Sequence, residues 1–120
     1  MRRSLTDKQI IRLKTDIDRV FKAGKRKSLS CFKVFSAAND FSYSRFIVIP
    51  VRHYGNSVRR NHIRRQVKEI WRLNQEKVPQ GFDYAIIVYP DSALSFREKE
   101  ELLLSLIDKC TPVHSGSQTE

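Results

Sequence analysis

Residues 57–76 constrain the fold of this chain more than any other segment, because their apolar side chains repeat with the period of a helix. At about 100° per residue, one arc of this helix collects Ile63, Val67, Ile70, Trp71 and Asn74. The turn Gly55-Asn56-Ser57 precedes the segment and is typical of a helix start. An amphipathic helix gains most of its stability by covering its apolar face, so we predict that this arc packs against the core of a folded domain.

Three runs of residues have the composition of strands. Residues 29–37 and 43–51 are rich in Phe, Val, Ile and Tyr, and Ala38-Asn39-Asp40 forms a turn between them. Residues 82–89 are almost continuously apolar. A run of that kind predicts a strand that is covered on both faces of its sheet.

Two capping patterns predict further helices. Thr15-x-x-Asp18 begins a first helix that stops at Gly24, and residues 6–14 are a candidate upstream extension of it. Residues 25–27, all cationic, are predicted to form a basic loop after this helix. Ser95-x-x-Glu98 is a capping box that begins a last helix.

These elements predict a small α/β (α+β) fold, a two-layer sandwich of helices against a sheet. A chain of 120 residues with 40% hydrophobic composition is long enough for one domain, which we place at residues 1–110. Residues 111–120 are predicted to be a disordered tail. The longest apolar run has six residues, far short of the roughly 20 that cross a membrane, so no membrane association is expected.

The cysteines and the first residues favour a cytoplasmic protein. Cys31 and Cys110 are too few for a disulfide scaffold, and we predict two reduced, buried thiols. No signal-peptide core follows Met1-Arg2-Arg3.

Positive charge is concentrated in the first two thirds of the chain. Residues 1–80 hold 20 Lys and Arg against 6 Asp and Glu, whereas residues 81–120 hold 3 against 7. The net charge of the whole chain is +10. Clustered charge of this kind predicts a polyanionic partner, and nucleic acid is the first candidate. The alternative is a basic surface that only keeps the protein in solution.

The same helix carries a cationic row at the border of its apolar arc. Its members, one turn apart, are Arg60, Arg64, Lys68 and Arg72, with Asn61 and Arg65 just beyond. Like charges at this spacing repel each other by a few tenths of a kcal/mol, and an anionic partner would relieve that repulsion. Guanidinium groups match the oxygens of phosphate, so we interpret the row as a phosphate-binding face. A solvated basic face is the competing interpretation.

The run from Gly55 to Arg65, Gly-Asn-Ser-Val-Arg-Arg-Asn-His-Ile-Arg-Arg, resembles the signature of the bacterial ribonuclease P protein subunit. Asp16 to Gly24 is similar to the first helix of that family, Asp-Phe-x-x-Val-Phe-Lys-x-Gly. Gly81-x-Asp83-Tyr84 and Leu94-x-Phe96-x-x-x-Glu100 resemble its last strand and last helix. The resemblance covers roughly residues 13–109.

The resemblance implies a four-stranded mixed sheet with three helices in the order αβββαβα, and a left-handed crossover at the main helix. It also implies a monomer within a complex that removes the 5′ leader from precursor tRNA. In such a complex a catalytic RNA and its bound Mg²⁺ perform the cleavage, and the protein alone binds no cofactor. The implied RNA-binding residues are Arg52, Arg59, Arg60, Asn61, His62, Arg64, Arg65, Lys68 and Arg72.

A second implied surface lies between the first helix and the sheet and would bind the leader. Its candidate residues are Ile17, Phe21, Lys33 and Phe35. Aromatic side chains stack on single-stranded bases without strong sequence preference. A simple core role for Ile17, Phe21 and Phe35 is the alternative.

Two departures from the family pattern affect the site. His62 occupies a position where the family has Arg, and a mostly neutral imidazole would weaken one phosphate contact. Before the turn the family often has Ser-x-Lys-Lys, whereas this chain has Pro50-Val51-Arg52-His53, so only Arg52 is a cationic match.

The residues offer little protein-based cleavage chemistry. Such cleavage usually needs metal-binding carboxylates or a histidine acid/base pair. His53, His62 and His114 have no metal-ligand spacing, and we predict no catalytic or metal-binding residue. Two other functions stay open at this point: a ribosomal or general RNA-binding protein, and a protein-only nuclease.

Overall fold

The computed structural model describes residues 9–23, 25–90 and 94–110. The helices and strands follow one another along the chain in the expected order αβββαβα. The elements are α1 (Lys14–Ala23), β1 (Lys25–Leu29), β2 (Phe32–Ala38), β3 (Arg45–Pro50), α2 (Ser57–Leu73), the 3₁₀ turn η2 (Gln75–Lys77), β4 (Phe82–Val88) and α3 (Phe96–Cys110).

The four strands form one mixed sheet in the order β1-β2-β4-β3. β1 pairs with β2, and β2 with β4, in antiparallel register, whereas β3 and β4 are parallel and joined through α2. β2 and β3 follow each other in the chain, yet β4 lies between them. This central position explains the continuous apolar run of β4 and confirms that both of its faces are covered.

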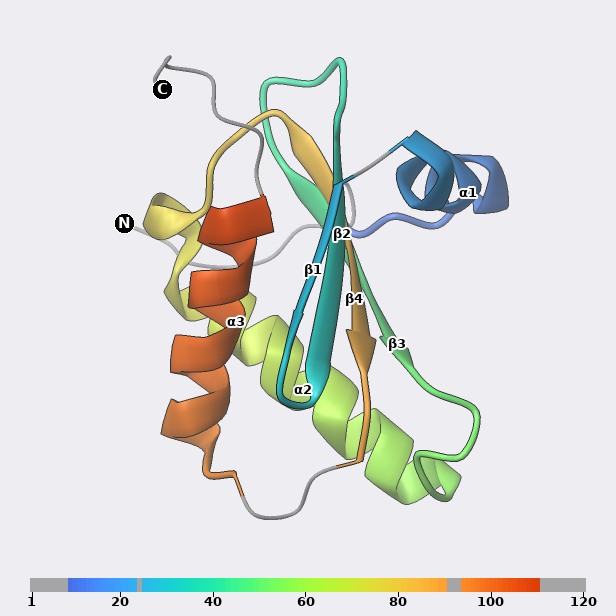
Figure 1. Cartoon of the computed structure of the whole chain (residues 1–120), viewed down its shortest axis with the longest axis vertical. Helices are drawn as coiled ribbons and strands as arrows, with labels where there is room; N and C mark the ends of the chain where they lie inside the picture. The colour runs from blue at the N-terminus through green and yellow to red at the C-terminus, as the bar shows by residue number, and fades with distance from the viewer. Residues whose placement is uncertain (1–8, 24, 91–93, 111–120) are drawn as a thin grey trace.

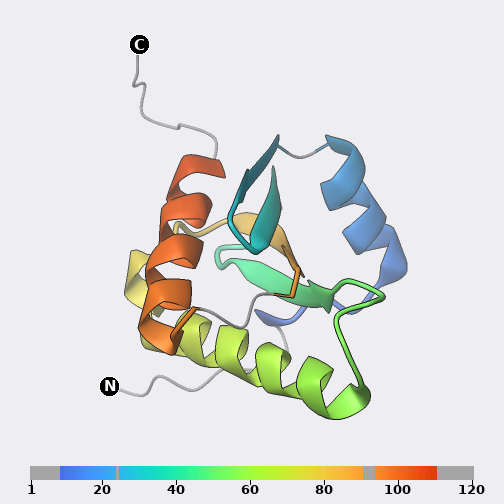
Figure 2. The same cartoon turned by 60° about the horizontal axis from the view of Figure 1, so that its bottom comes forward.

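Helices cover the two faces of the sheet unequally (Figures 1 and 2). α2 and α3 lie on one face over the main core, where the Trp71 ring stacks on Phe46 with ring centroids 4.2 Å apart. α1 lies on the opposite face, over a smaller cluster made by Val20, Phe35, Ala37 and Ala85. The fold is therefore the predicted α+β arrangement, with a single short helix on its second face.

Several sequence predictions are confirmed. The predicted apolar arc of α2 is buried in full, including Asn74, which is 5% exposed. The capping box of α3 forms, because Ser95 N–H donates to Glu98 Oε1 at 2.8 Å and Glu98 N–H donates to Ser95 Oγ at 3.2 Å. Both cysteines are buried, and neither is in a disulfide.

Two predictions near the first hairpin are wrong. Residues 25–27 are not a loop but the start of β1, an edge strand whose five side chains are all exposed and therefore lack an alternating pattern. The predicted strand 29–37 is divided by a turn at Ser30, whose φ of 57° is the left-handed conformation that interrupts a strand.

Two helix boundaries also differ. Residues 9–13 do not extend α1, because Ile10 and Ile11 run along the free edge of β3 and Ile11 N–H donates to the Phe46 carbonyl at 2.9 Å. The helix predicted over 57–76 ends at Leu73, and the chain continues as the separate turn η2.

Three predicted features lie outside the described residues: the tail 111–120, the stop at Gly24 and the part of the upstream extension within residues 1–8. None of the described helices is long and apolar enough to cross a membrane.

Candidate nucleic-acid interface

α2 begins at a turn that only glycine fits easily. Gly55 has a φ of +151°, and a Cβ there would lie 3.0 Å from Arg59 Cδ. Asn56 then caps the helix, since its Oδ1 accepts the backbone N–H of Arg59 at 3.0 Å. The cap fixes the first turn of α2, from which Arg59 and Asn61 project into solvent.

The two ends of the cationic row have partners inside the protein. Arg60 donates from Nη1 to the carbonyls of Val51 at 2.7 Å and Arg52 at 3.3 Å, and from Nη2 to that of Pro50 at 3.2 Å. Arg60 therefore holds the loop between β3 and α2, and both of its Nη groups are in use.

At the other end, Arg72 forms a bidentate pair with Glu69, with N–O distances of 2.9 and 2.6 Å. The hydrogen bond raises the pKa of Arg72 and lowers the pKa of Glu69. The positive charge of Arg72 is thus neutralised within its own helix.

The middle of the row faces outward. Arg64 is half-buried and donates to Asn61 Oδ1 at 3.3 Å, whereas Arg65 and Lys68 are exposed. Arg52, Arg59 and His62 are exposed as well, so the structure leaves six of the nine candidate RNA-binding side chains exposed: Arg52, Arg59, Asn61, His62, Arg65 and Lys68.

A pocket of about 330 Å³ lies where α2 meets the free edge of β3. Arg64 and Lys68 line one side, and Arg12 lines it from the segment before α1. Its lining includes Ile10 and Ile47, which are half-buried. Sequence reasoning missed Arg12, because residues 9–13 carry no motif and their place beside β3 depends on a pairing across 36 residues of chain.

The candidate leader residues gather on the other face of the sheet. The Phe21 ring from α1 meets the Phe35 ring from β2 edge to face, with centroids 4.8 Å apart. Lys33 Nζ lies 5.7 Å from the centroid of Phe35, within the range of a cation–π contact. Ile17, one helical turn before Phe21, is half-buried. Phe35 is only 9% exposed, so its ring mainly supports Phe21, and Phe21 is the more accessible aromatic.

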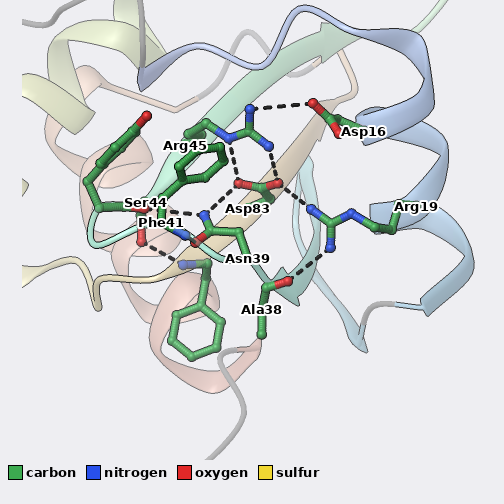
Figure 3. A network of polar contacts seen from close by, with 10 residues as sticks. Asp16, Arg19, Ala38, Asn39, Phe41, Ser44, Arg45 and Asp83 are labelled. Carbon is green, nitrogen blue, oxygen red and sulfur yellow. Dashed lines mark hydrogen bonds and ion pairs between the residues drawn. The ribbon is translucent and has the colours of Figure 1, made fainter.

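A cluster of polar side chains lies under α1, beside these residues (Figure 3). The carboxylate of Asp83 on β4 is fully buried and accepts hydrogen bonds from Arg19 on α1, Arg45 on β3 and Asn39. The bond with Asp83 raises the pKa of Arg45. Sequence reasoning assigned no role to Asp83, because nothing local to an apolar strand shows which cations reach it.

The described residues contain no group of three or more His, Cys, Asp or Glu side chains placed to hold a metal ion. His53 and His62 are both exposed, and neither has a described acid partner. The candidate interface residues are mainly cations, amides and aromatics, which are side chains that suit phosphate binding and base stacking.

The comparison with protein families decides the assignment. The Ribonuclease P family model matches residues 5–111. The chain belongs to the ribonuclease P family. A ribonuclease P protein component of Thermotoga maritima is 35% identical over 116 residues, covering 91% of this chain and 97% of the relative. The ribonuclease P protein component of Thermotoga sp. strain RQ2 is 37% identical over 95 residues, covering 79% of this chain and 80% of the relative.

Solved structures agree with this family assignment. The ribonuclease P protein from Thermotoga maritima superposes with a TM-score of 0.77 at 32% identity, covering 85% of this chain and 97% of that one. A Staphylococcus aureus ribonuclease P protein gives a TM-score of 0.76 at 19% identity, with 84% and 94% coverage, and supports the fold alone. The ribonuclease P signature on α2 and the fold therefore point to the same family.

Proposed function

We propose that this chain is the protein subunit of a bacterial ribonuclease P, which removes the 5′ leader from precursor tRNA. The observation that carries the proposal is the family signature on α2, whose cations Arg59, Arg65 and Lys68 are exposed on a well-capped helix. Exposed guanidinium and ammonium groups along one helix bind phosphates and contribute affinity that falls with salt. We assign this face to the RNA subunit.

The face formed by α1 and β2 is assigned to the leader. Phe21 offers a ring for stacking, and Lys33 places a cation beside the same ring pair. Stacking on an aromatic side chain contributes about 1–3 kcal/mol per base and tolerates any sequence. A leader bound in this way would let the complex distinguish precursor tRNA from mature tRNA, which has no leader.

The chemistry is assigned to the RNA subunit and to Mg²⁺ held by it, with the protein as an accessory, monomeric subunit. This division is supported by the residues of the candidate interface, which are mainly cations, amides and aromatics suited to phosphate binding and stacking. The two buried cysteines, which form no disulfide, fit a reducing compartment, and we place the complex in the cytoplasm.

The leader assignment is tested by comparing the affinity of the reconstituted complex for precursor and mature tRNA. Wild type should prefer the precursor. Phe21→Leu, which removes the accessible ring but keeps an apolar side chain, should lower that preference by roughly five-fold or more, and Phe35→Leu by less. Phe96→Leu is the matched control, because Phe96 is also half-buried but packs on the opposite face of the sheet.

A complex that binds both tRNAs equally would contradict the leader assignment. The RNA-subunit assignment has a separate test, the identity of the RNA that co-purifies with the tagged protein. We expect the RNA subunit of ribonuclease P. Recovery of ribosomal RNA alone would favour a general RNA-binding protein instead.

A further inference from the structure

Apolar contacts hold α1 on the sheet over a small area. Val20 is the one fully buried side chain among the described residues of α1, and its buried partners are Phe35, Ala37 and Ala85, with Phe21, Ile47 and Ile87 partly buried around them. Apolar burial stabilises in proportion to the area removed from water, and half of the buried cluster is alanine, so this contact is modest for a whole helix. Yet α1 carries Ile17 and Phe21, whose position against the sheet matters for binding a leader.

Polar contacts to Asp83 add a second attachment (Figure 3). Arg19 donates from Nη2 to Asp83 Oδ2 at 2.6 Å, and from Nη1 to the Ala38 carbonyl at 2.9 Å. Arg45 donates to both oxygens of Asp83, at 2.9 and 2.6 Å, and Asn39 donates to Oδ1 at 2.8 Å. The fully buried carboxylate therefore joins α1, β3 and the end of β2 through one group.

A second link reaches α1 one turn earlier. Arg45 Nη1 lies 3.4 Å from Asp16 Oδ2, so Asp16 and Arg19 fix two successive turns of the helix. The two arginines are balanced by two aspartates, which leaves this cluster of four charged side chains with no net charge. Because both guanidinium groups are engaged with carboxylates, the cluster is built for holding the helix rather than for binding phosphate.

We propose that Asp83 is a positioning residue for leader recognition: through Arg19 and Arg45 it fixes α1, and with it Phe21 and Ile17, against β2. The inference rests on the proposed function, since it concerns the same leader surface. Asp83 and Arg19 do not contact RNA in this proposal. They affect leader binding by fixing the position of α1 on the sheet.

The test uses Arg19→Met and Arg19→Lys in the reconstituted complex. The Arg19 side chain is 40% exposed, so its replacement should leave the protein folded. Arg19→Met keeps the apolar stem and loses both donors, and it should lower the precursor-over-mature preference by roughly five-fold, as if one stacked base were lost. Arg19→Lys retains one ion pair and should recover part of the preference. The salt dependence of precursor binding should stay unchanged.

Two controls separate positioning from other roles. Arg97→Met removes an exposed arginine paired with Glu101 on α3, and should leave the preference unchanged. Ile107→Val removes a methyl group from the main core and so lowers the stability of the protein without touching α1. It should also leave the precursor preference unchanged. Asp83→Asn makes the protein more positive, yet the proposal expects weaker precursor preference, the opposite of a simple charge effect.

The outcomes are distinguishable. A preference that survives Arg19→Met overturns the inference, whatever the change in melting temperature. If the magnitude of the salt slope falls by about 0.7 in Arg19→Met, Arg19 binds a leader phosphate directly, which also overturns the inference. If the wild-type complex shows no precursor preference at all, the proposed leader function itself fails.

Discussion

Arg60 and Arg65 lie on the same helix, α2, and carry the same charge, but their surroundings give them different roles. The guanidinium of Arg60 turns back onto three carbonyls of the loop before the helix, at Pro50, Val51 and Arg52. Arg65 is exposed. A residue that matches a family motif can therefore stabilise the binding surface without being the group that contacts RNA.

Changing Arg64 and Arg65 together to Ala should weaken binding of the RNA subunit with little loss of stability. Both lie off the buried arc of α2, so the core is retained. Each phosphate contact that is lost should lower the magnitude of the slope of log K against log salt by about 0.7–0.9. Affinity measured over a salt series checks this, with Arg97→Ala on α3 as a charge-matched control. An unchanged affinity and slope would show that the row is only a solvated face.

Arg60→Met should behave in the opposite way. Losing hydrogen bonds from a charged donor to three loop carbonyls should lower the free energy of unfolding by roughly 1–3 kcal/mol. The salt slope for RNA binding should change less than in the Arg64/Arg65 variant. Urea denaturation and the same salt series measure both quantities. If the salt slope instead changes by the amount expected for one phosphate contact while the free energy of unfolding stays the same, Arg60 contacts the RNA directly.

At the scale of elements, local sequence patterns predicted α2, β4 and α3, because each buries residues at a regular spacing. β1 was missed because an exposed edge strand of Lys25-Arg26-Lys27 has no buried face to produce a pattern. The contacts of Asp83 and the place of Arg12 were unpredictable for another reason. They depend on which strands become neighbours, and β4 inserts between β2 and β3 from more than 30 residues away.

The end of α3 should make stability depend on pH in the alkaline range. Cys110 Sγ–H donates to the carbonyls of Lys25 and Val34, both at 3.2 Å, and burial raises the pKa of this thiol. A raised pKa means that the stabilisation is complete below the unfolded pKa of about 8.5 and is lost as pH rises beyond it.

Urea denaturation of wild type and Cys110→Ala at several values of pH from 7 to 10 tests this. The stability advantage of wild type should shrink above about pH 8.5, where the unfolded thiol ionises. An advantage that stays constant to pH 10 would mean that the thiol ionises as easily in the folded protein as in the unfolded chain.

At the scale of the whole molecule, the uneven charge of the sequence gives the folded protein surfaces that differ in charge. The cationic helix α2 and the helix α1, which carries candidate leader residues, lie on opposite faces of the sheet (Figure 2). The pocket lined by Arg12, Arg64 and Lys68 lies at the edge of β3 beside α2. α3 carries four acidic residues against three cationic ones, whereas α2 carries six cations against Glu69 alone. We expect an uneven field of this kind to orient the protein on a polyanion with α2 toward it.

The central claim is that this protein binds and positions RNA, while the RNA subunit performs the cleavage. The most direct measurement is cleavage of a 5′-labelled precursor tRNA with Mg²⁺ present, by protein purified free of RNA and by the same protein combined with the RNA subunit. We predict release of the leader at the mature 5′ end by the combined complex, and no cleavage by the protein alone. Multiple-turnover cleavage by the protein that survives extensive removal of RNA would contradict the claim.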